Sequence, residues 1–317
     1  MKQTILLTGK TGQVGSHLYL LLGNLGEVVA PRRNELDLSN ADAIRRTVRE
    51  LRPNLIVNAA AYTAVDAAET DESTARAINT TALLVLAEEA KKLGAVIVHY
   101  SSDYVFDGSR ANPYEEIDPP NPINVYGKTK LEGELAVRKS GVPHLIFRTS
   151  WVYARGGRNF LLTILRLATE REELKIVQDQ IGAPTWSREI ALATAKILSR
   201  FIEPGDRPSL LSRYSGTYHI TAGGETTWYG FASAILEEAA RVSKTTSWFA
   251  AVTCGRPLIT KRIIPITAAE YPTQASRPAY SVLSNSRFIR TFGFALPDWR
   301  TQLQQCFSPH KPIDWFL

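Results

Sequence analysis

The first two dozen residues constrain the fold more than any other stretch. An apolar run over residues 4–8 leads directly into Gly9, Gly12 and Gly15, spaced G-x-x-G-x-x-G, and helical periodicity follows to residue 23. Glycines at a strand-to-helix turn permit a tight bend, and the N–H groups of the new helix can bind a pyrophosphate. The spacing differs from the G-x-G-x-x-G fingerprint but serves the same geometry. It predicts a dinucleotide-binding turn, with a plain strand end as the alternative.

The same alternation continues through the first half of the chain. Short apolar runs cover residues 27–30, 55–58, 95–100 and 144–148, and helical patterns cover residues 12–23, 41–51, 73–93 and 125–140. Continuous Val, Ile and Leu runs indicate strands that are buried on both faces, and their alternation with helices indicates a parallel sheet. We therefore predict an α/β protein with a Rossmann-type, doubly wound parallel sheet.

The regular alternation of strand and helix patterns ends at about residue 150. Prolines and glycines gather at residues 182–184 and 272–278, between shorter helical patterns. This change predicts a cofactor-binding Rossmann domain over residues 1–150. It also predicts a smaller part over residues 151–317 that mainly binds substrate, with some segments returning to the main sheet.

Composition excludes several classes of function. The net charge is +6, and the basic residues are mixed with acidic ones, so nucleic-acid binding is not expected. The two cysteines, Cys254 and Cys306, are far apart and lack metal-ligand spacing, which predicts reduced thiols. No signal-peptide segment and no run of about 18 apolar residues occurs, so we expect a cytoplasmic protein without a membrane span.

The end of the second predicted strand bears on the choice of cofactor. NAD-selective sites usually carry an acid there for the ribose 2′-hydroxyl, whereas this chain has Arg32 and Arg33. A guanidinium pairs bidentately with phosphate oxygens, so these arginines suit a 2′-phosphate. We predict NADPH as the cofactor, with acceptance of NADH left open. The alternative is that both arginines are merely solvated at the surface.

Other cofactor contacts are expected where strands end, because ligands of open α/β sheets lie at the carboxyl ends of the strands. The small residues after the third strand would let the backbone approach the cofactor, although they also suit tight helix–sheet packing. The predicted cofactor-binding residues are Gly9, Thr11, Gly12, Gln13, Val14, Gly15, Arg32, Arg33, Asp37, Leu38, Ala59, Ala60, Ala61, Tyr62, Thr63, Tyr100, Tyr126 and Lys130.

A candidate catalytic set follows the fourth strand. Tyr126 and Lys130 form a Tyr-x-x-x-Lys pair, which places both on one helical face. A neighbouring ammonium favours the phenolate and brings the tyrosine nearer to working pH. Ser102, at the strand end, can donate a hydrogen bond to a substrate carbonyl oxygen. We predict Ser102, Tyr126 and Lys130 as the catalytic residues.

With the glycine turn, the strand-end serine and Tyr-x-x-x-Lys in this order, the chain resembles the extended short-chain dehydrogenase/reductase family. Further stretches at residues 57–66, 99–106, 124–130, 148–153, 179–185 and 271–278 resemble the members that reduce 4-keto sugars carried on dTDP. The resemblance implies NADPH-dependent reduction of dTDP-4-dehydro-β-L-rhamnose to dTDP-L-rhamnose, the last step of dTDP-rhamnose biosynthesis. Tyr126 would then be the proton donor, Lys130 its partner and a ribose ligand, and Ser102 the hydroxyl that binds the carbonyl.

The resemblance also implies a binding site for the dTDP-sugar substrate. Trp151 could instead be core packing, because tryptophan combines an apolar body with a polar edge. The implied substrate-binding residues are Ser102, Asp103, Tyr104, Val105, Phe106, Trp151 and Arg277.

The sequence departs from some bacterial relatives at two positions. Those relatives dimerise around magnesium held by glutamates, whereas His17 and Arg188 stand at the matching positions here. An arginine would repel a cation that prefers oxygen ligands. We therefore predict no metal and a monomer rather than a metal-bridged dimer, unless Glu189 takes the place of Arg188.

Two other functions remain open from the sequence alone. One is another sugar-nucleotide enzyme of the same fold, although Ser102 is not followed by the Asp-Glu pair of the dehydratases. The other is a non-catalytic, NADP-binding subunit like the regulatory subunit of methionine adenosyltransferase.

Overall fold

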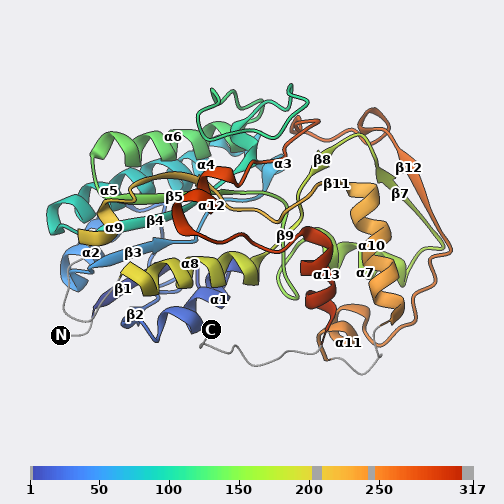
Figure 1. The fold of residues 1–317 in the computed structure, drawn as a ribbon, viewed down its shortest axis with the longest axis horizontal. Helices are drawn as coiled ribbons and strands as arrows, with labels where there is room; N and C mark the ends of the chain where they lie inside the picture. Colours follow the sequence, from blue (N-terminus) through green and yellow to red (C-terminus); the bar gives the residue numbers. More distant parts are fainter. Residues whose placement is uncertain (1–2, 202–208, 242–246, 309–317) are drawn as a thin grey trace.

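A six-stranded parallel sheet organises the molecule. The computed structural model describes residues 3–201, 209–241 and 247–308. The strands lie in the order β10-β5-β4-β3-β1-β2, and each neighbouring pair is parallel, so their carboxyl ends share one edge (Figure 1). The predicted Rossmann-type sheet is confirmed. Its strands are β1 (Thr4–Thr8), β2 (Glu27–Val29), β3 (Leu55–Asn58), β4 (Val96–Ser102), β5 (His144–Thr149) and β10 (Gly216–His219).

Helices cover both faces of this sheet, because its strands alternate apolar side chains between two buried clusters. Ile5 and Leu7 of β1 belong to one cluster, whereas Leu6 belongs to the other. Figure 1 shows α5 and α6 on one side of the sheet and α1 and α8 on the other. The covering helices are α1 (Gln13–Leu22), α8 (Ser187–Phe201) and α12 (Ser286–Phe292) on one face, and α2 (Ala41–Leu51), α5 (Ala82–Leu93) and α6 (Val125–Ser140) on the other.

The helix predicted over residues 73–93 differs in the structure. It is divided into α4 (Glu72–Arg76), a wide π-helical turn η1 (Ala77–Thr81) and α5. The turn brings the Asn79 carbonyl against α6, where a Cβ on Gly133 would lie 2.2 Å from that oxygen. The Asn79 amide also accepts a hydrogen bond from Tyr62 N–H at 2.9 Å and donates to the Thr129 hydroxyl at 3.1 Å. These tertiary contacts explain the wide turn, which helical periodicity alone does not reveal.

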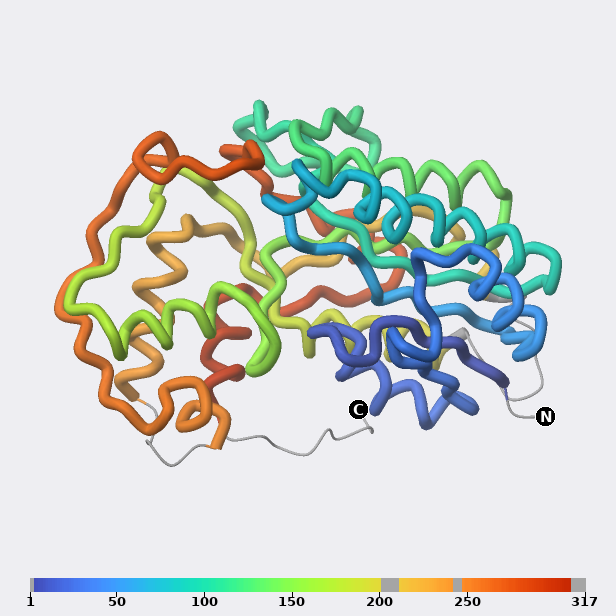
Figure 2. The backbone as a smooth tube through the Cα atoms, turned by 180° about the vertical axis from the view of Figure 1, so that it is seen from behind, coloured from blue at the N-terminus to red at the C-terminus, as the bar shows by residue number. Residues whose placement is uncertain are grey.

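A smaller group of helices and strand pairs lies beside the sheet (Figure 2). It has its own hydrophobic cluster, which includes Tyr153, Trp186, Phe231 and Leu303. Its helices are α7 (Phe160–Ala168), α10 (Trp228–Arg241), α11 (Ser247–Thr253) and α13 (Trp299–Phe307). Its strand pairs are β7 (Glu173–Val177) with β12 (Arg262–Ile266), β6 (Val152–Tyr153) with β9 (Thr185–Trp186), and β8 (Ile181–Gly182) with β11 (Thr226–Thr227).

Chain segments after residue 150 also complete the main sheet, because β10 pairs with β5 and α8 packs on α1. Residues 202–208, 242–246 and 309–317 of the predicted second part lie outside the described residues. Within the described part, no helix has the length and apolar character needed to cross a membrane. The remaining short elements are α3 (Val65–Ala68), α9 (Ser209–Ser212), η2 (Asp103–Val105) and η3 (Ala268–Glu270).

Candidate active site

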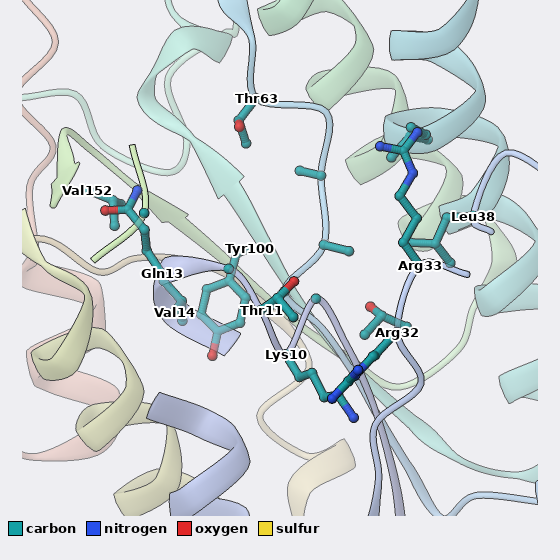
Figure 3. Close-up of a pocket in the computed structure, with 18 of the residues that line it drawn as sticks. Lys10, Thr11, Gln13, Val14, Arg32, Arg33, Leu38, Thr63, Tyr100 and Val152 are labelled. Carbon is teal, nitrogen blue, oxygen red and sulfur yellow. The ribbon is translucent and has the colours of Figure 1, made fainter. Parts of the chain in front are cut away.

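A cavity of about 520 Å³ opens at the carboxyl edge of the sheet (Figure 3). Most of the predicted cofactor-binding residues line it, together with both residues of the Tyr-x-x-x-Lys pair. The predicted residues that line the cavity are Gly9, Thr11, Gly12, Gln13, Val14, Arg32, Arg33, Asp37, Leu38, Ala59, Ala60, Ala61, Thr63, Tyr100, Tyr126 and Lys130.

The glycine turn after β1 forms part of the cavity wall. Gly9 has a φ of +80°, and a Cβ there would lie 2.6 Å from the Ala60 backbone nitrogen. A Cβ on Gly15 would lie 2.0 Å from the Gly9 carbonyl oxygen. Gly15 is itself buried and does not line the cavity, so its role in this structure is to let α1 pack against the turn. These close backbone contacts require glycine at both positions.

The amino end of α1 suits an anion. Gly12 is its N-cap, and no side chain of the described residues caps this helix. Its first residues, Gln13 and Val14, line the cavity, so first-turn N–H groups are placed at the cavity wall. The cations Lys10, Arg32, Arg33 and Arg158 line the same cavity, and the carboxylate-bearing Asp37 lines it as well. An oligophosphate fits this balance of charge.

The two arginines after β2 are exposed at the cavity rim. Figure 3 shows their side chains leaving the same turn in different directions. Asp37 nearby accepts a hydrogen bond from Ser39 N–H at 2.9 Å, and hydrogen bonds from Ser39 lower the pKa of its carboxyl, with a smaller contribution from Arg33. Asp37 is therefore an ionised group held in a local turn.

Tyr126 lies in the first turn of α6, whose start is fixed by Asn124. The Asn124 side chain accepts from Gly127 N–H at 2.7 Å and donates to the Ser276 carbonyl at 2.8 Å. A Cβ on Gly127 would lie 2.1 Å from the Tyr104 carbonyl oxygen, so glycine allows α6 to approach the loop after β4. The tyrosine ring meets the Tyr104 ring edge-on, at a centroid distance of 5.7 Å.

Burial controls the protonation of the Tyr-x-x-x-Lys pair. It raises the pKa of Tyr126 to about 12, opposed by a hydrogen bond with Ser102. It lowers the pKa of Lys130 to about 8, opposed by the carboxylate of Glu134. Tyr126 is thus a neutral phenol at neutral pH, able to donate a proton. The expectation that Lys130 brings the tyrosine pKa nearer to working pH is wrong for this structure, because burial of the phenol dominates. Lys130 titrates about one unit above neutrality.

Ser102 lies beside a buried carboxylate. Its hydroxyl donates to Asp103 Oδ1 at 2.9 Å and accepts from Tyr104 N–H at 3.1 Å, while Ser150 donates to Asp103 Oδ2 at 3.0 Å. Burial raises the pKa of Asp103 to about 6, although these hydrogen bonds act in the opposite direction. Ser102 and Asp103 are both buried, and neither of them lines the cavity described above.

A second polar cluster lies next to Tyr104. The Arg277 guanidinium donates two hydrogen bonds to the Asp66 carboxylate, at 2.7 and 3.2 Å. The Ala275 N–H donates to the same carboxylate at 3.1 Å. The arginine holds the pKa of Asp66 below its usual value. This pair joins the segment after β3 to the segment after β12. Asp66 is therefore the residue that orients Arg277.

Trp151 has a partner that the sequence did not suggest. It stacks on Trp228, with ring centroids 3.4 Å apart and an interplanar angle of 3°. A Cβ on Gly182 would lie 2.4 Å from the Trp151 ring, and Trp151 has the left-handed φ of +46°. Strained backbone of this kind is frequent at binding sites. Trp151 is half-buried and does not line the cavity described above.

Three predicted contacts have side chains that face other residues. Val105 and Phe106 are completely buried, and Phe106 stacks on Tyr114 at 4.2 Å. The Tyr62 hydroxyl is 3.4 Å from Asp71. The structure thus gives these side chains packing contacts, and none of the three lines the cavity.

Of the two positions that bear on the metal prediction, His17 lines another recess and Arg188 lies next to a residue of its wall. His17 and Trp186 line it, and the Arg188 guanidinium lies 5.2 Å from the Trp186 ring. Arg188 also pairs with Glu189 at 3.4 Å, and burial raises the pKa of that glutamate. The expectation of no metal stays a prediction.

The sequence reasoning missed several residues that shape the site. Gly127 immediately follows the tyrosine of the motif, and Asp66 and Trp228 act through partners distant in the chain. Only Gly127 had a local signal, since a glycine in the first turn of a helix marks a close approach. Arg158 reaches the cavity from the segment between β6 and α7.

Comparison with known proteins places this chain in a family. The model of the family described as RmlD substrate binding domain matches residues 1–311, and the chain belongs to that family. It is 49% identical over 302 residues to a dTDP-4-dehydrorhamnose reductase of Burkholderia thailandensis, covering 95% of this chain and 97% of the relative. It is 44% identical over 308 residues to the protein of that name from Salmonella typhimurium, covering 96% and 97%.

Solved structures agree with this assignment. A dTDP-4-dehydrorhamnose reductase from Bacillus anthracis, in complex with NADP, superposes with a TM-score of 0.83 at 32% identity, covering 97% of this chain and 99% of that one. A UDP-glucose 4-epimerase from Thermus thermophilus shares the fold, with a TM-score of 0.72 at 19% identity. The resemblance inferred from the motifs is confirmed.

Proposed function

We propose that this chain is an oxidoreductase that uses NADPH to reduce dTDP-4-dehydro-β-L-rhamnose to dTDP-L-rhamnose. The observation that carries the proposal is the shared cavity: the glycine turn, Tyr126 and Lys130 line one space at the carboxyl edge of the sheet. A dinucleotide held on the glycine turn therefore extends toward a proton donor. This arrangement suits hydride transfer to a ketone.

The cavity fits the cofactor. The backbone approach at Gly9 leaves no room for a Cβ, and the uncapped end of α1 with Lys10 suits a pyrophosphate. Arg32 and Arg33 are the candidates for the 2′-phosphate of NADPH. When bound, NADPH supplies a hydride to the carbonyl carbon of the substrate.

The protein's own residues handle the proton. Tyr126, a neutral phenol, donates its proton to the carbonyl oxygen as the carbon accepts the hydride, which yields the alcohol. Ser102 hydrogen bonds the same oxygen once its hydroxyl leaves Asp103. Lys130 stabilises the phenolate that remains and contributes to binding of the cofactor ribose.

We assign the sugar nucleotide mainly to the part of the chain after residue 150. Arg277, held by Asp66, is a cation suited to the diphosphate, and Trp151 offers an aromatic face. Ser102, Asp103 and Tyr104, with the backbone of Val105 and Phe106, complete this side. We also propose that the enzyme is a monomer that needs no metal and works in the cytoplasm.

The test is a coupled synthesis. The protein is incubated with NADPH and with dTDP-4-dehydrorhamnose made from dTDP-glucose by the upstream dehydratase and epimerase, and the product is identified by chromatography and NMR. A dTDP-L-rhamnose product supports the proposal. A different epimer means another 4-ketosugar reductase, and cofactor binding without turnover on any dTDP-4-ketosugar means a binding subunit.

A further inference from the structure

A continuous chain of buried polar groups connects three strands of the sheet to Lys130. The Thr8 hydroxyl donates to Asn58 Oδ1 at 2.5 Å, and Asn58 Nδ2 lies 3.1 Å from His99 Nδ1. His99 Nε2 lies 3.1 Å from Lys130 Nζ, which also donates to the Tyr100 carbonyl at 2.6 Å. Each of the four side chains is at most 2% exposed. A buried polar chain of this kind costs free energy unless its members are paired, so their placement calls for a role.

We propose that His99 is a positioning residue for Lys130, holding its amino group at the cavity wall in both of its protonation states. This inference rests on the proposed function, because it deepens the part assigned to Lys130. It adds a residue from β4 that does not line the cavity and acts only through the lysine.

The ring of His99 is neutral across the working pH range. Burial, and after it the charge of Lys130, holds the pKa of His99 well below its ordinary value. The groups that act on Lys130 are the His99 ring and the Tyr100 carbonyl from β4 and Glu134 one turn after it on α6. Glu134 is already engaged by Arg148 of β5 at 2.7 Å. The neutral ring and the Tyr100 carbonyl are therefore the two uncharged direct partners of the lysine, and only the ring can change the direction of its hydrogen bond.

A neutral imidazole can serve either form of a lysine, because each ring nitrogen either donates or accepts. An ammonium donates to an unprotonated Nε2, whereas an amine accepts from Nε2–H. In the arrangement seen, Asn58 Oδ1 accepts from Thr8 and, at 3.3 Å, from Ala60 N–H. Asn58 Nδ2 is thus turned toward Nδ1 of His99, which leaves the ring hydrogen on Nε2, facing an amine.

The direction of the hydrogen bonds therefore follows the charge of Lys130. Charging the lysine requires His99 to move its hydrogen to Nδ1 and the Asn58 amide to turn over, which breaks the two hydrogen bonds to Oδ1. The chain thus opposes the charged form, in the same direction as burial, which lowers the pKa of Lys130 to about 8. Losing this chain should raise the pH at which Lys130 titrates.

Two substitutions at His99 separate its two contacts. In His99→Gln the terminal amide lies near the place of Nε2 and keeps the contact with Lys130, whereas in His99→Asn it lies near Nδ1 and loses that contact. We expect His99→Asn to lower kcat about tenfold or more and to move the limb of the pH profile near 8 upward by about half a unit. His99→Gln should remain within about threefold of the wild type. The control is His219→Gln, a buried histidine of β10 outside the cavity, which should change neither quantity.

An unshifted pH limb in His99→Asn, or equal damage in His99→Gln, overturns the proposal. Melting temperatures show whether each variant folds. If His99→Asn does not fold, Thr8→Val replaces it: this change keeps the volume but removes one hydrogen bond to Asn58 Oδ1. It should shift the limb in the same direction by a smaller amount, and an unchanged limb again overturns the proposal.

A second measurement needs no substrate, so it stands even if the proposed function fails. Nitrogen-15 NMR of labelled histidines, with His99 assigned through His99→Gln, reports which ring nitrogen carries the hydrogen. We expect the hydrogen on Nδ1 at pH 6 and on Nε2 at pH 10, with a midpoint near 8 and no charged ring between. A ring that becomes charged near its ordinary pKa, or a single tautomer throughout, overturns the proposal.

Discussion

The two sides of the proposed site are built in different ways. The cofactor side consists of backbone and small side chains that follow β1 and β3, with Gly9 and Ala60 in close contact. The sugar side consists of long side chains paired across large sequence separations: Arg277 with Asp66, and Trp151 with Trp228. The first side is encoded within short stretches of chain, whereas the second exists only after the whole chain has folded.

This difference has a physical cause. A dinucleotide is bound largely by backbone N–H groups and a helix end, which need only a turn of the right shape. A sugar nucleotide needs oriented side chains, and these need partners to hold their rotamers. Substitutions should therefore affect the two sides separately.

The largest expected effect is on kcat and concerns Tyr126, where the cofactor side and the sugar side of the proposed site meet. Tyr126→Phe keeps the ring that packs on Tyr104 but removes the proton donor, so kcat should fall by at least about a hundredfold while NADPH affinity is unchanged. Steady-state kinetics and fluorescence titration measure both. Tyr114→Phe, which loses a buried hydroxyl outside the cavity, is the control. Near-normal turnover in Tyr126→Phe would remove the proton-donor assignment.

The next effect concerns stability and pH. Because the pKa of Asp103 is about 6 in the fold against 3.8 for the free group, the folded state binds the proton more tightly than the unfolded state. Stability should therefore fall as pH rises from about 4 to above 6, by about 3 kcal/mol in all.

Asp103→Asn abolishes this loss, so the variant should gain stability relative to the wild type as pH rises. Urea unfolding at pH 4.5 and 7.5 measures the difference. Parallel pH dependence in the two proteins would show that Asp103 titrates normally.

A pair of glycine substitutions tests whether the two sides are independent. A Cβ on Gly15 meets the Gly9 carbonyl, and one on Gly182 meets the Trp151 ring. Overpacking of this kind costs about 1–3 kcal/mol. Gly15→Ala should weaken NADPH binding about tenfold to a hundredfold, whereas Gly182→Ala should raise mainly the KM for the sugar nucleotide.

Gly156→Ala is the matched control, since its Cβ meets nothing within 4 Å. Calorimetric titration of each ligand against each variant gives the comparison. Equal loss of both ligands in either variant would mean that the sides are coupled.

The smallest expected effect is on the choice of cofactor. If Arg32 or Arg33 binds the 2′-phosphate, the KM for NADPH should be about tenfold below that for NADH, because an exposed charged pair is screened by salt. Replacing both with alanine should raise the KM for NADPH alone. Equal KM values in the wild type, or equal losses in the variant, would make both arginines solvated surface groups.

Much of the cofactor side was predictable from the sequence, because its signals are local. The runs at residues 4–8 and 55–58 coincide with β1 and β3, and the pattern at 125–140 coincides with α6. Periodicity and glycine spacing report backbone geometry directly. The prediction was weaker for Gly15 and Tyr62, since their spacing does not tell whether a residue faces the ligand or the core.

Tertiary structure alone decided the rest. The sequence determined a parallel sheet, a glycine-rich turn between the first strand and the first helix, and a Tyr-x-x-x-Lys pair on one helix. It did not show that Asp66 holds Arg277, that Trp228 stacks on Trp151, or that His99 meets Lys130. Hydrogen bonds and ring contacts between distant segments depend on which side chains the packing of helices on the sheet brings together, and no local pattern encodes them.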